Sequence, residues 1–104
     1  MNIRTNFLSG RLTVYLSGEL DHHEARCAIR EIDELIDGYL PRDCVLDMKE
    51  LSFMDSSGIA VIVRVNRRMK TLGGRVWIEN PAKQPLRVID ASGVDRLVPI
   101  AISK

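Results

Sequence analysis

Two serines follow an aspartate in Asp55-Ser56-Ser57-Gly58, and these residues have the types and spacing that could do chemistry. The apolar stretch 51–54 leads into them, and a long pattern of helical spacing follows at once. Asp and Ser are favoured helix N-caps because their side-chain oxygens accept hydrogen bonds from unpaired backbone N–H groups. The pattern predicts that both serines lie at the surface where a helix emerges from a loop. A hydroxyl there could be a plain cap, a donor in an anion site, a nucleophile or a phosphorylation target.

A nucleophilic role for either serine would need a base held and oriented beside it. The only histidines are His22 and His23, and neither serine lies in a Gly-x-Ser-x-Gly turn. The chain also lacks a Gly-x-x-x-x-Gly-Lys loop, so no motif supports nucleotide binding. Serine hydrolysis is therefore disfavoured. Weak anion binding at the helix start and a purely structural cap both stay open.

The triplet Asp21-His22-His23, with Glu24 after it, offers metal-binding chemistry. Carboxylate and imidazole are good transition-metal ligands, so a small metal-dependent phosphoesterase is one alternative. Adjacent histidines at a helix start diverge, however, and a hydrolytic site needs further carboxylates from other segments. No second cluster of that kind is evident in the sequence. We therefore predict no metal, no cofactor and no enzymatic activity, with Asp21 as a helix cap and both histidines exposed on a functional surface.

A basic helix face is formed by Arg64, Arg67 and Arg68, with Lys70 and Arg75 nearby. Nucleic-acid binding would favour interleaved aromatic side chains for base stacking, which this face lacks. The net charge is +1, from 15 basic and 14 acidic residues, and it predicts neither nucleic-acid nor membrane binding. A solvated helix face is the favoured interpretation, although part of it could meet an acidic partner.

The length of 104 residues predicts a single domain, 1–104, that can bury a core without disulfides or metals. The N-terminus has no apolar signal-peptide core, and no apolar run approaches a membrane span. The cytoplasm is therefore the expected location. Cys27 and Cys44 lie inside apolar patterns and are expected to be buried free thiols.

Hydrophobic periodicity predicts strands where apolar and polar residues alternate and helices where apolar residues recur at helical spacing. The expected strands are 3–8, 11–17, 44–46, 75–79 and 97–100, and the expected helices are 22–39, 57–72 and 80–92. The order β-β-α-β-α-β-α-β predicts an α/β fold with helices packed against a mixed sheet. The buried stripes of the first two helices are expected at Ala25, Ala28, Ile29, Ile32, Leu35, Ile36 and Tyr39, and at Ile59, Ile62, Val65, Met69 and Leu72.

Glycine and proline are expected to bound these elements. Gly38 and Pro41 should stop the first helix, and Gly93 should end the third. Pro85 is tolerable only inside the first turn of its helix, where a missing N–H costs nothing. Pro99 suggests that the last strand lies at an edge of the sheet.

Four motifs in the right order and at matching spacing together resemble the bacterial anti-sigma factor antagonists, which are small STAS-domain proteins. They are Gly18-Glu19-Leu20-Asp21-His22-His23, the stretch 51–58, Gly73-Gly74 and Ser92-Gly93. The similarity covers essentially the whole chain, and its Asp-His-His variant resembles the sporulation branch more than the general-stress branch. The resemblance implies a STAS-type mixed sheet with helices packed against it.

The resemblance also implies a partner-switching cycle. An unphosphorylated antagonist binds an anti-sigma factor that is also a serine kinase, which frees the sigma factor. The kinase phosphorylates one serine, here Ser56 by motif position, and a serine phosphatase restores the antagonist. The partner-binding residues implied in this chain are Asp21, His22, His23, Asp55, Ser56, Ser57 and Gly58. A STAS module of another circuit, such as a stressosome-like scaffold or a transport accessory, is the alternative.

Overall fold

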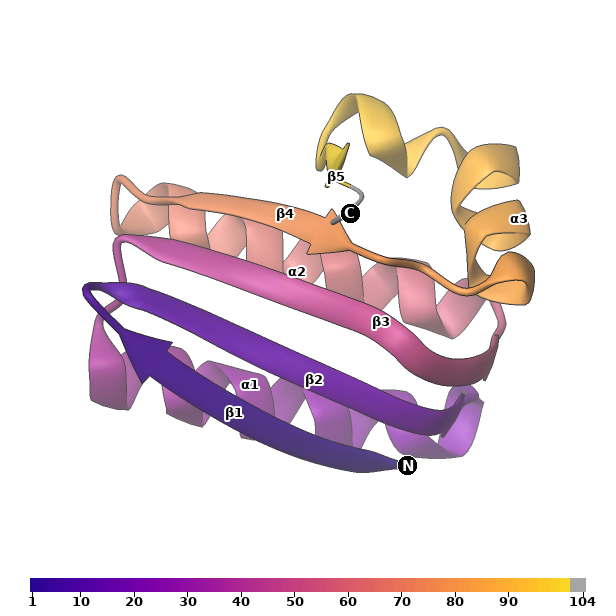
Figure 1. Ribbon diagram of the computed structural model, residues 1–104, viewed down its shortest axis with the longest axis horizontal. Coiled ribbons are helices and arrows are strands. Elements are labelled where there is room, and N and C mark those ends of the chain that lie inside the picture. The colour runs from indigo at the N-terminus through magenta and orange to yellow at the C-terminus, as the bar shows by residue number, and fades with distance from the viewer. Residues whose placement is uncertain (102–104) are drawn as a thin grey trace.

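The computed structural model describes residues 1–101, which form a five-stranded sheet and three α-helices (Figure 1). The elements in chain order are β1 (Asn2–Leu8), β2 (Arg11–Leu20), α1 (His22–Tyr39), β3 (Asp43–Met54), α2 (Ser56–Thr71), β4 (Arg75–Glu79), α3 (Lys83–Ser92), the 3-10 turn η1 (Val94–Arg96) and β5 (Ile100–Ala101). The predicted fold class and element order are confirmed. Residues 102–104 of the predicted domain lie outside the described residues.

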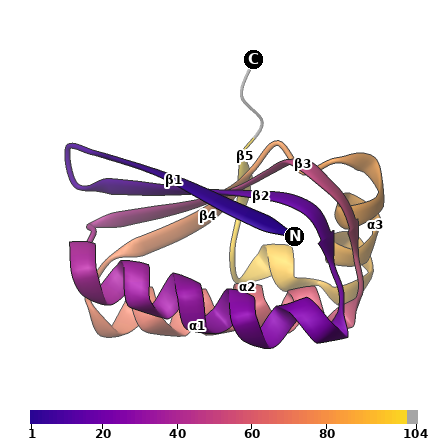
Figure 2. The same cartoon turned by 90° about the horizontal axis from the view of Figure 1, so that it is seen from below.

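The strands lie in sequence order across the sheet, β1-β2-β3-β4-β5. The β1–β2 hairpin is antiparallel, and the remaining pairs of neighbours are parallel. The helices α1 and α2 pack side by side on one face of this sheet (Figure 2). This arrangement brings the carboxyl ends of β2 and β3, and the helix starts that follow them, to the same end of the molecule (Figure 1).

The hydrophobic core lies between the sheet and the α1–α2 pair. Leu12, Val14 and Leu16 of β2 are buried, as their alternation predicted. They meet the stripes of the two helices, including Ile36 of α1 and Ile62 of α2, which are fully buried. Burying a side chain of this size stabilises the fold by about 1.5–3 kcal/mol.

The strand predicted at 44–46 is much longer, since β3 runs from Asp43 to Met54. Its buried residues beyond Leu46 are Met48, Leu51 and Met54, whose spacing does not follow a period of two. The cause is two register shifts in the pairing with β2, at 15–17 and at 18–19. Such irregularities break the alternation from which a strand is recognised. The loop expected before α2 is therefore reduced to one residue.

α1 ends where it was predicted, at residue 39, and α2 ends one residue before the predicted 72. The helix runs past Gly38, and Leu40, directly before Pro41, takes the left-handed conformation (φ 47°) and donates its N–H to the Ile36 carbonyl at 2.8 Å. Tyr39 was expected on the buried stripe but is 44% exposed. Leu72 is similarly 40% exposed, just after the end of α2. In both helices the stripe leaves the core at the last turn.

The C-terminal elements are shorter than predicted. The helix expected from 80 begins at Lys83, which places Pro85 in the first turn, where it was predicted to be tolerated. Pro85 and Ile89 are the buried residues of α3, whereas Leu86 is only half-buried. The strand expected at 97–100 is shortened to β5 at 100–101, which follows η1 after the irregular residues 97–99. It does lie at the sheet edge, as Pro99 suggested.

The two cysteines lie in different surroundings. Cys44 is fully buried in β3, and burial raises the pKa of its thiol to about 12. Cys27 is exposed, so the prediction of two buried thiols is wrong for this residue. Cys27 lies in α1 between Ala25 and Ala28, which form the buried stripe, but its own side chain is directed away from the core.

Candidate functional site

Two strand-to-helix junctions lie side by side at one end of the sheet (Figure 1). Leu20 ends β2, Met54 ends β3, and the two are paired in register. An aspartate follows each of them, Asp21 before α1 and Asp55 before α2. The Asp55 N–H also donates to the Leu20 carbonyl at 3.4 Å. The two halves of the predicted site are therefore neighbours in space.

Both aspartates cap their helices in nearly the same backbone conformation, with φ −104° and ψ −173° at Asp21 and φ −107° and ψ −168° at Asp55. An Asp21 carboxylate oxygen accepts from the Glu24 N–H at 3.0 Å, as the sequence predicted. The Asp55 carboxylate accepts from the Ser57 N–H at 2.8 Å. The α2 cap is therefore Asp55, and the idea that a serine hydroxyl caps this helix is wrong. Asp55 precedes both serines, and its carboxylate already accepts from the backbone N–H that a capping hydroxyl would otherwise satisfy.

The two serines differ in exposure. Ser56 is the first residue of α2 and is exposed, and its hydroxyl makes no hydrogen bond to any other residue within 1–101. Ser57 is half-buried and lies in a groove of about 530 Å³ between the first turns of α1 and α2. The groove is lined by His22, His23, Ala25, Arg26, Cys27, Ile29, Ser57 and Ala60. The structure thus joins the histidine pair to the serine pair across one surface.

Gly58 allows the first turn of α2 to pack closely against the ends of β2 and β3. It is buried in the first turn of α2. A Cβ atom at this position would lie 2.5 Å from the Met54 sulfur and 3.3 Å from a Leu20 methyl. Only a residue without a side chain lets the start of α2 pack directly on the ends of β2 and β3. The sequence placed Gly58 in the site, and its packing supplies the physical reason.

Gln84 is a supporting residue that the sequence did not reveal. Its amide oxygen accepts from the Met54 N–H at 2.8 Å, and its amide nitrogen donates to the Met54 carbonyl at 3.0 Å. The side chain therefore pairs with the last residue of β3 as an adjacent strand would. Thirty residues separate the partners, and no local pattern connects them. This contact fixes the backbone directly before Asp55.

Gln84→Ala is expected to lower the free energy of unfolding by about 1–3 kcal/mol, because it leaves the N–H and C=O of Met54 without partners in a partly buried place. The melting temperature should fall by several degrees, which thermal unfolding followed by circular dichroism would measure. Lys83→Ala, an exposed neighbour in the same helix, is the matched control. Equal melting temperatures of the two variants would show that Gln84 does not hold the strand end.

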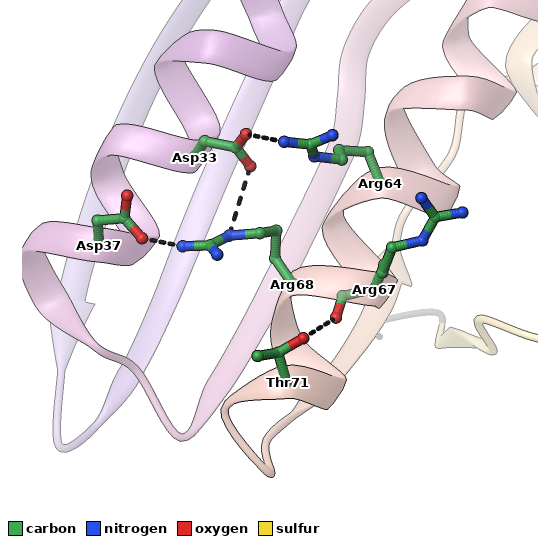
Figure 3. A network of polar contacts seen from close by, with 6 residues as sticks. All are labelled: Asp33, Asp37, Arg64, Arg67, Arg68 and Thr71. Carbon is green, nitrogen blue, oxygen red and sulfur yellow. Dashed lines mark hydrogen bonds and ion pairs between the residues drawn. The ribbon is translucent and has the colours of Figure 1, made fainter.

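An ion-pair network on the solvent side ties α1 to α2 (Figure 3). Arg64 contacts Asp33 at 3.0 Å, and Arg68 lies between Asp33, at 3.8 Å, and Asp37. The basic face was expected to be solvated, but two of its three arginines pair with acidic residues of this same chain. Arg67 points away from α1 (Figure 3). Exposed pairs contribute little individually, about 0.2–1 kcal/mol, so their main effect is to set how the two helices lie together.

Two further features concern metals and membranes. The rings of His22 and His23 lie edge to face with centroids 6.1 Å apart. Within residues 1–101 no group of three or more His, Cys, Asp or Glu side chains is placed to hold a metal ion. None of the helices in this part of the chain has the length and apolar character needed to cross a membrane.

Comparison with known proteins identifies relatives of this arrangement. The family model of the STAS domain matches residues 2–103. The anti-sigma F factor antagonist of Paenibacillus polymyxa is 37% identical over 91 residues, which span 88% of this chain and 78% of that protein. The unphosphorylated form of the anti-sigma factor antagonist SpoIIAA superposes with a TM-score of 0.85 at 24% identity, covering 99% of this chain and 89% of that one. The phosphorylated form of the Bacillus cell fate determinant SpoIIAA superposes with a TM-score of 0.75 at 24% identity, covering 99% and 92%.

Proposed function

Because this chain belongs to the STAS domain family, and within it to the anti-sigma factor antagonists, we propose that it binds an anti-sigma factor that is also a serine kinase. Binding releases a sigma factor. Phosphorylation of Ser56 by the bound kinase ends the interaction, and a serine phosphatase removes the phosphate. In this cycle the chain is a binding partner and a substrate, without catalysis of its own and without a cofactor, nucleic acid or membrane.

The observation that carries this proposal is the exposed, uncommitted hydroxyl of Ser56 at the start of α2. A kinase has to reach its acceptor oxygen and align it with the transferred phosphoryl group. Ser56 meets that requirement because Asp55 already supplies the helix cap. Ser57 meets it less well, since it is half-buried and faces the groove.

The groove beside Ser56 suits protein docking. Its lining combines the apolar Ala25, Ile29 and Ala60 with the polar His22, His23 and Arg26. Protein interfaces combine apolar area with polar groups in this way. The proposed partner surface comprises Asp21, His22, His23, Asp55, Ser56, Ser57 and Gly58.

A phosphate on Ser56 would act on docking with little effect on the fold. It adds about −1.5 to −2 charges at neutral pH. At a helix N-terminus the dipole favours such a charge by about 0.3–1 kcal/mol, and the adjacent carboxylate of Asp55 opposes it. In a partner interface the same anion has to be desolvated and meets any like charge at close range. The switch therefore works through the free energy of binding.

Phosphate mapping tests the site. We expect the cognate kinase with ATP to label the wild-type chain on Ser56, as read by mass spectrometry. Ser57→Ala should remain labelled and Ser56→Ala should not, because Ser56 is exposed whereas Ser57 is half-buried. Undiminished labelling of Ser56→Ala would refute the assignment. Failure of any serine kinase from the host to bind the chain would favour a STAS module of another circuit.

A further inference from the structure

A second cavity, of about 410 Å³, lies beside the later turns of α2, away from the serine end of that helix. It is lined by Asn66, Lys70, Gly74, Arg75, Val76, Trp77, Leu97, Pro99, Ile100 and Ala101. Its lining carries two cations and no acidic side chain. The volume falls within the range of about 300–1,000 Å³ typical of small-molecule sites, which are mostly apolar with a few convergent polar groups.

One of these polar groups is the backbone N–H of Val76, which faces an open stretch of sheet edge. β5 pairs only with Ile78 and Glu79 of β4. The Ile78 N–H donates to the Pro99 carbonyl at 2.9 Å. The Arg75 N–H points to the opposite side of β4 and donates to the Arg42 carbonyl at 3.0 Å. Because successive N–H groups of a strand alternate between its two neighbours, the Val76 N–H points to the β5 side. No hydrogen bond from it to another described residue occurs there.

The second polar group is the side chain of Asn66. It lies on the buried stripe of α2 between Val65 and Met69 and is only 8% exposed. Its amide makes no hydrogen bond within the described part of the chain. Among the described residues, its amide atoms are not sealed from solvent. Asn66 lines this cavity, so the amide is available to a ligand there.

The third group is cationic. Lys70 lies one turn after Asn66 on α2 and is exposed at the cavity. Most of the remaining lining is apolar, and its Leu97 is 46% exposed. Three donors therefore line a cavity that otherwise offers mainly hydrocarbon surface.

We propose that this cavity binds a small carboxylate with an apolar body. The planar anion accepts from the Val76 N–H, the Asn66 amide and the Lys70 ammonium, which together match its two oxygens and their lone pairs. The apolar body covers Leu97 and Pro99. The site lies apart from Ser56 and from the groove beside it, so this inference stands independently of the kinase cycle.

Titration of the ¹⁵N-labelled chain with phenylbutyrate and with octanoate tests the proposal by NMR. We expect saturable shifts of the Val76 amide, the Leu97 amide and the Trp77 indole N–H with at least one of the two acids. Phenylbutanol has the same apolar body without the carboxylate, and it should bind at least about tenfold more weakly. Equal affinity for acid and alcohol, or no saturable shift of these groups with either acid, would overturn the proposal.

Two variants test whether the carboxylate binds at Asn66 and Lys70. Asn66→Leu should weaken phenylbutyrate or octanoate binding by about tenfold while keeping or raising the melting temperature, because the amide makes no hydrogen bond within the described residues that leucine would break. A purely structural role of Asn66 would give the opposite thermal result. Lys70→Gln changes an exposed residue and should weaken binding without affecting folding. The control is Lys49→Gln, an exposed lysine on β3. Unchanged affinity in both Asn66→Leu and Lys70→Gln would refute the site.

Discussion

Replacing Ser56 by aspartate is expected to weaken binding to the kinase by about 100-fold, which corresponds to about 2.7 kcal/mol. The new carboxylate lies between Asp55 and Ser57, and Ser57 lines the proposed docking groove. Two adjacent negative charges there have to be desolvated together, and like charges brought together in an interface cost several kcal/mol. Isothermal titration calorimetry of the purified pair would measure the change.

The same substitution should leave the melting temperature within a few degrees of the wild type. Ser56 is exposed and forms no hydrogen bond within residues 1–101 that aspartate would break. A negative charge in the first turn of a helix is favourable by about 0.3–1 kcal/mol, which offsets part of the repulsion from Asp55. A large loss of stability would mean that the charge acts by unfolding α2.

A control for long-range charge is Ser9→Asp in the β1–β2 turn, at the opposite end of the molecule from the start of α2 (Figure 1). Ser9 has φ 52°, a conformation that aspartate tolerates better than most residues. The variant adds the same charge and should bind the kinase like the wild type. Equal weakening by Ser9→Asp and Ser56→Asp would contradict a local mechanism, as would unchanged affinity of Ser56→Asp.

The neighbourhood of the two helix starts follows from the order of elements. A strand-helix-strand-helix order predicts parallel strands, whose carboxyl ends lie at one edge of the sheet. The aspartates that follow β2 and β3 can therefore be placed together from the sequence, which also indicates Asp21 as a cap. The sequence does not choose the α2 cap among Asp55 and the two serines, because all three have suitable oxygens and only the backbone geometry decides among them.

Contacts between distant segments were not predictable in the same way. The pairing of Gln84 with Met54 joins residues 30 apart. Arg64 and Arg68 find Asp33 and Asp37 on another helix, whereas sequence rules cover only charges three or four apart on one helix. Such contacts depend on how the elements pack, which periodicity does not specify.

Periodicity also misses residues that break its pattern. The second half of β3 shows no alternation, because its register shifts against β2, so the pattern does not extend the strand beyond 46. Asn66 is buried on the α2 stripe although it is polar, so a pattern of apolar residues does not include it. Cys27 falls inside an apolar pattern that predicts burial, although its position is directed to solvent. Cys27 lines the groove, Asn66 lines the second cavity, and the second half of β3 ends directly before the serine pair.

Gly58→Ala is expected to lower the free energy of unfolding by about 1–3 kcal/mol, the usual cost of overpacking a core. Alanine favours a helix over glycine by up to about 1 kcal/mol, so the intrinsic preference opposes this result. The close contact outweighs the helix preference and makes the change in the free energy of unfolding unfavourable, because the added methyl would lie 2.5 Å from the Met54 sulfur and 3.3 Å from Leu20. Met54 is fully buried, and Gln84 holds its backbone, so it has no space into which to retreat.

Gly38→Ala is the matched control, because Gly38 lies within α1, is exposed, and has no heavy atom within 4 Å of the position of a Cβ. There the helix preference acts alone, and a gain of about 0.5–1 kcal/mol is expected. Urea denaturation would give both values.

In a Met54→Ala background the cost of Gly58→Ala should largely disappear, because the two side chains compete for one space. If Gly58→Ala instead matched Gly38→Ala in the wild-type background, the close approach of α2 to β3 would not be what holds Ser56 in place. If it destabilises as expected, the turn that presents Ser56 has to move, and the rate of its phosphorylation should fall with the stability.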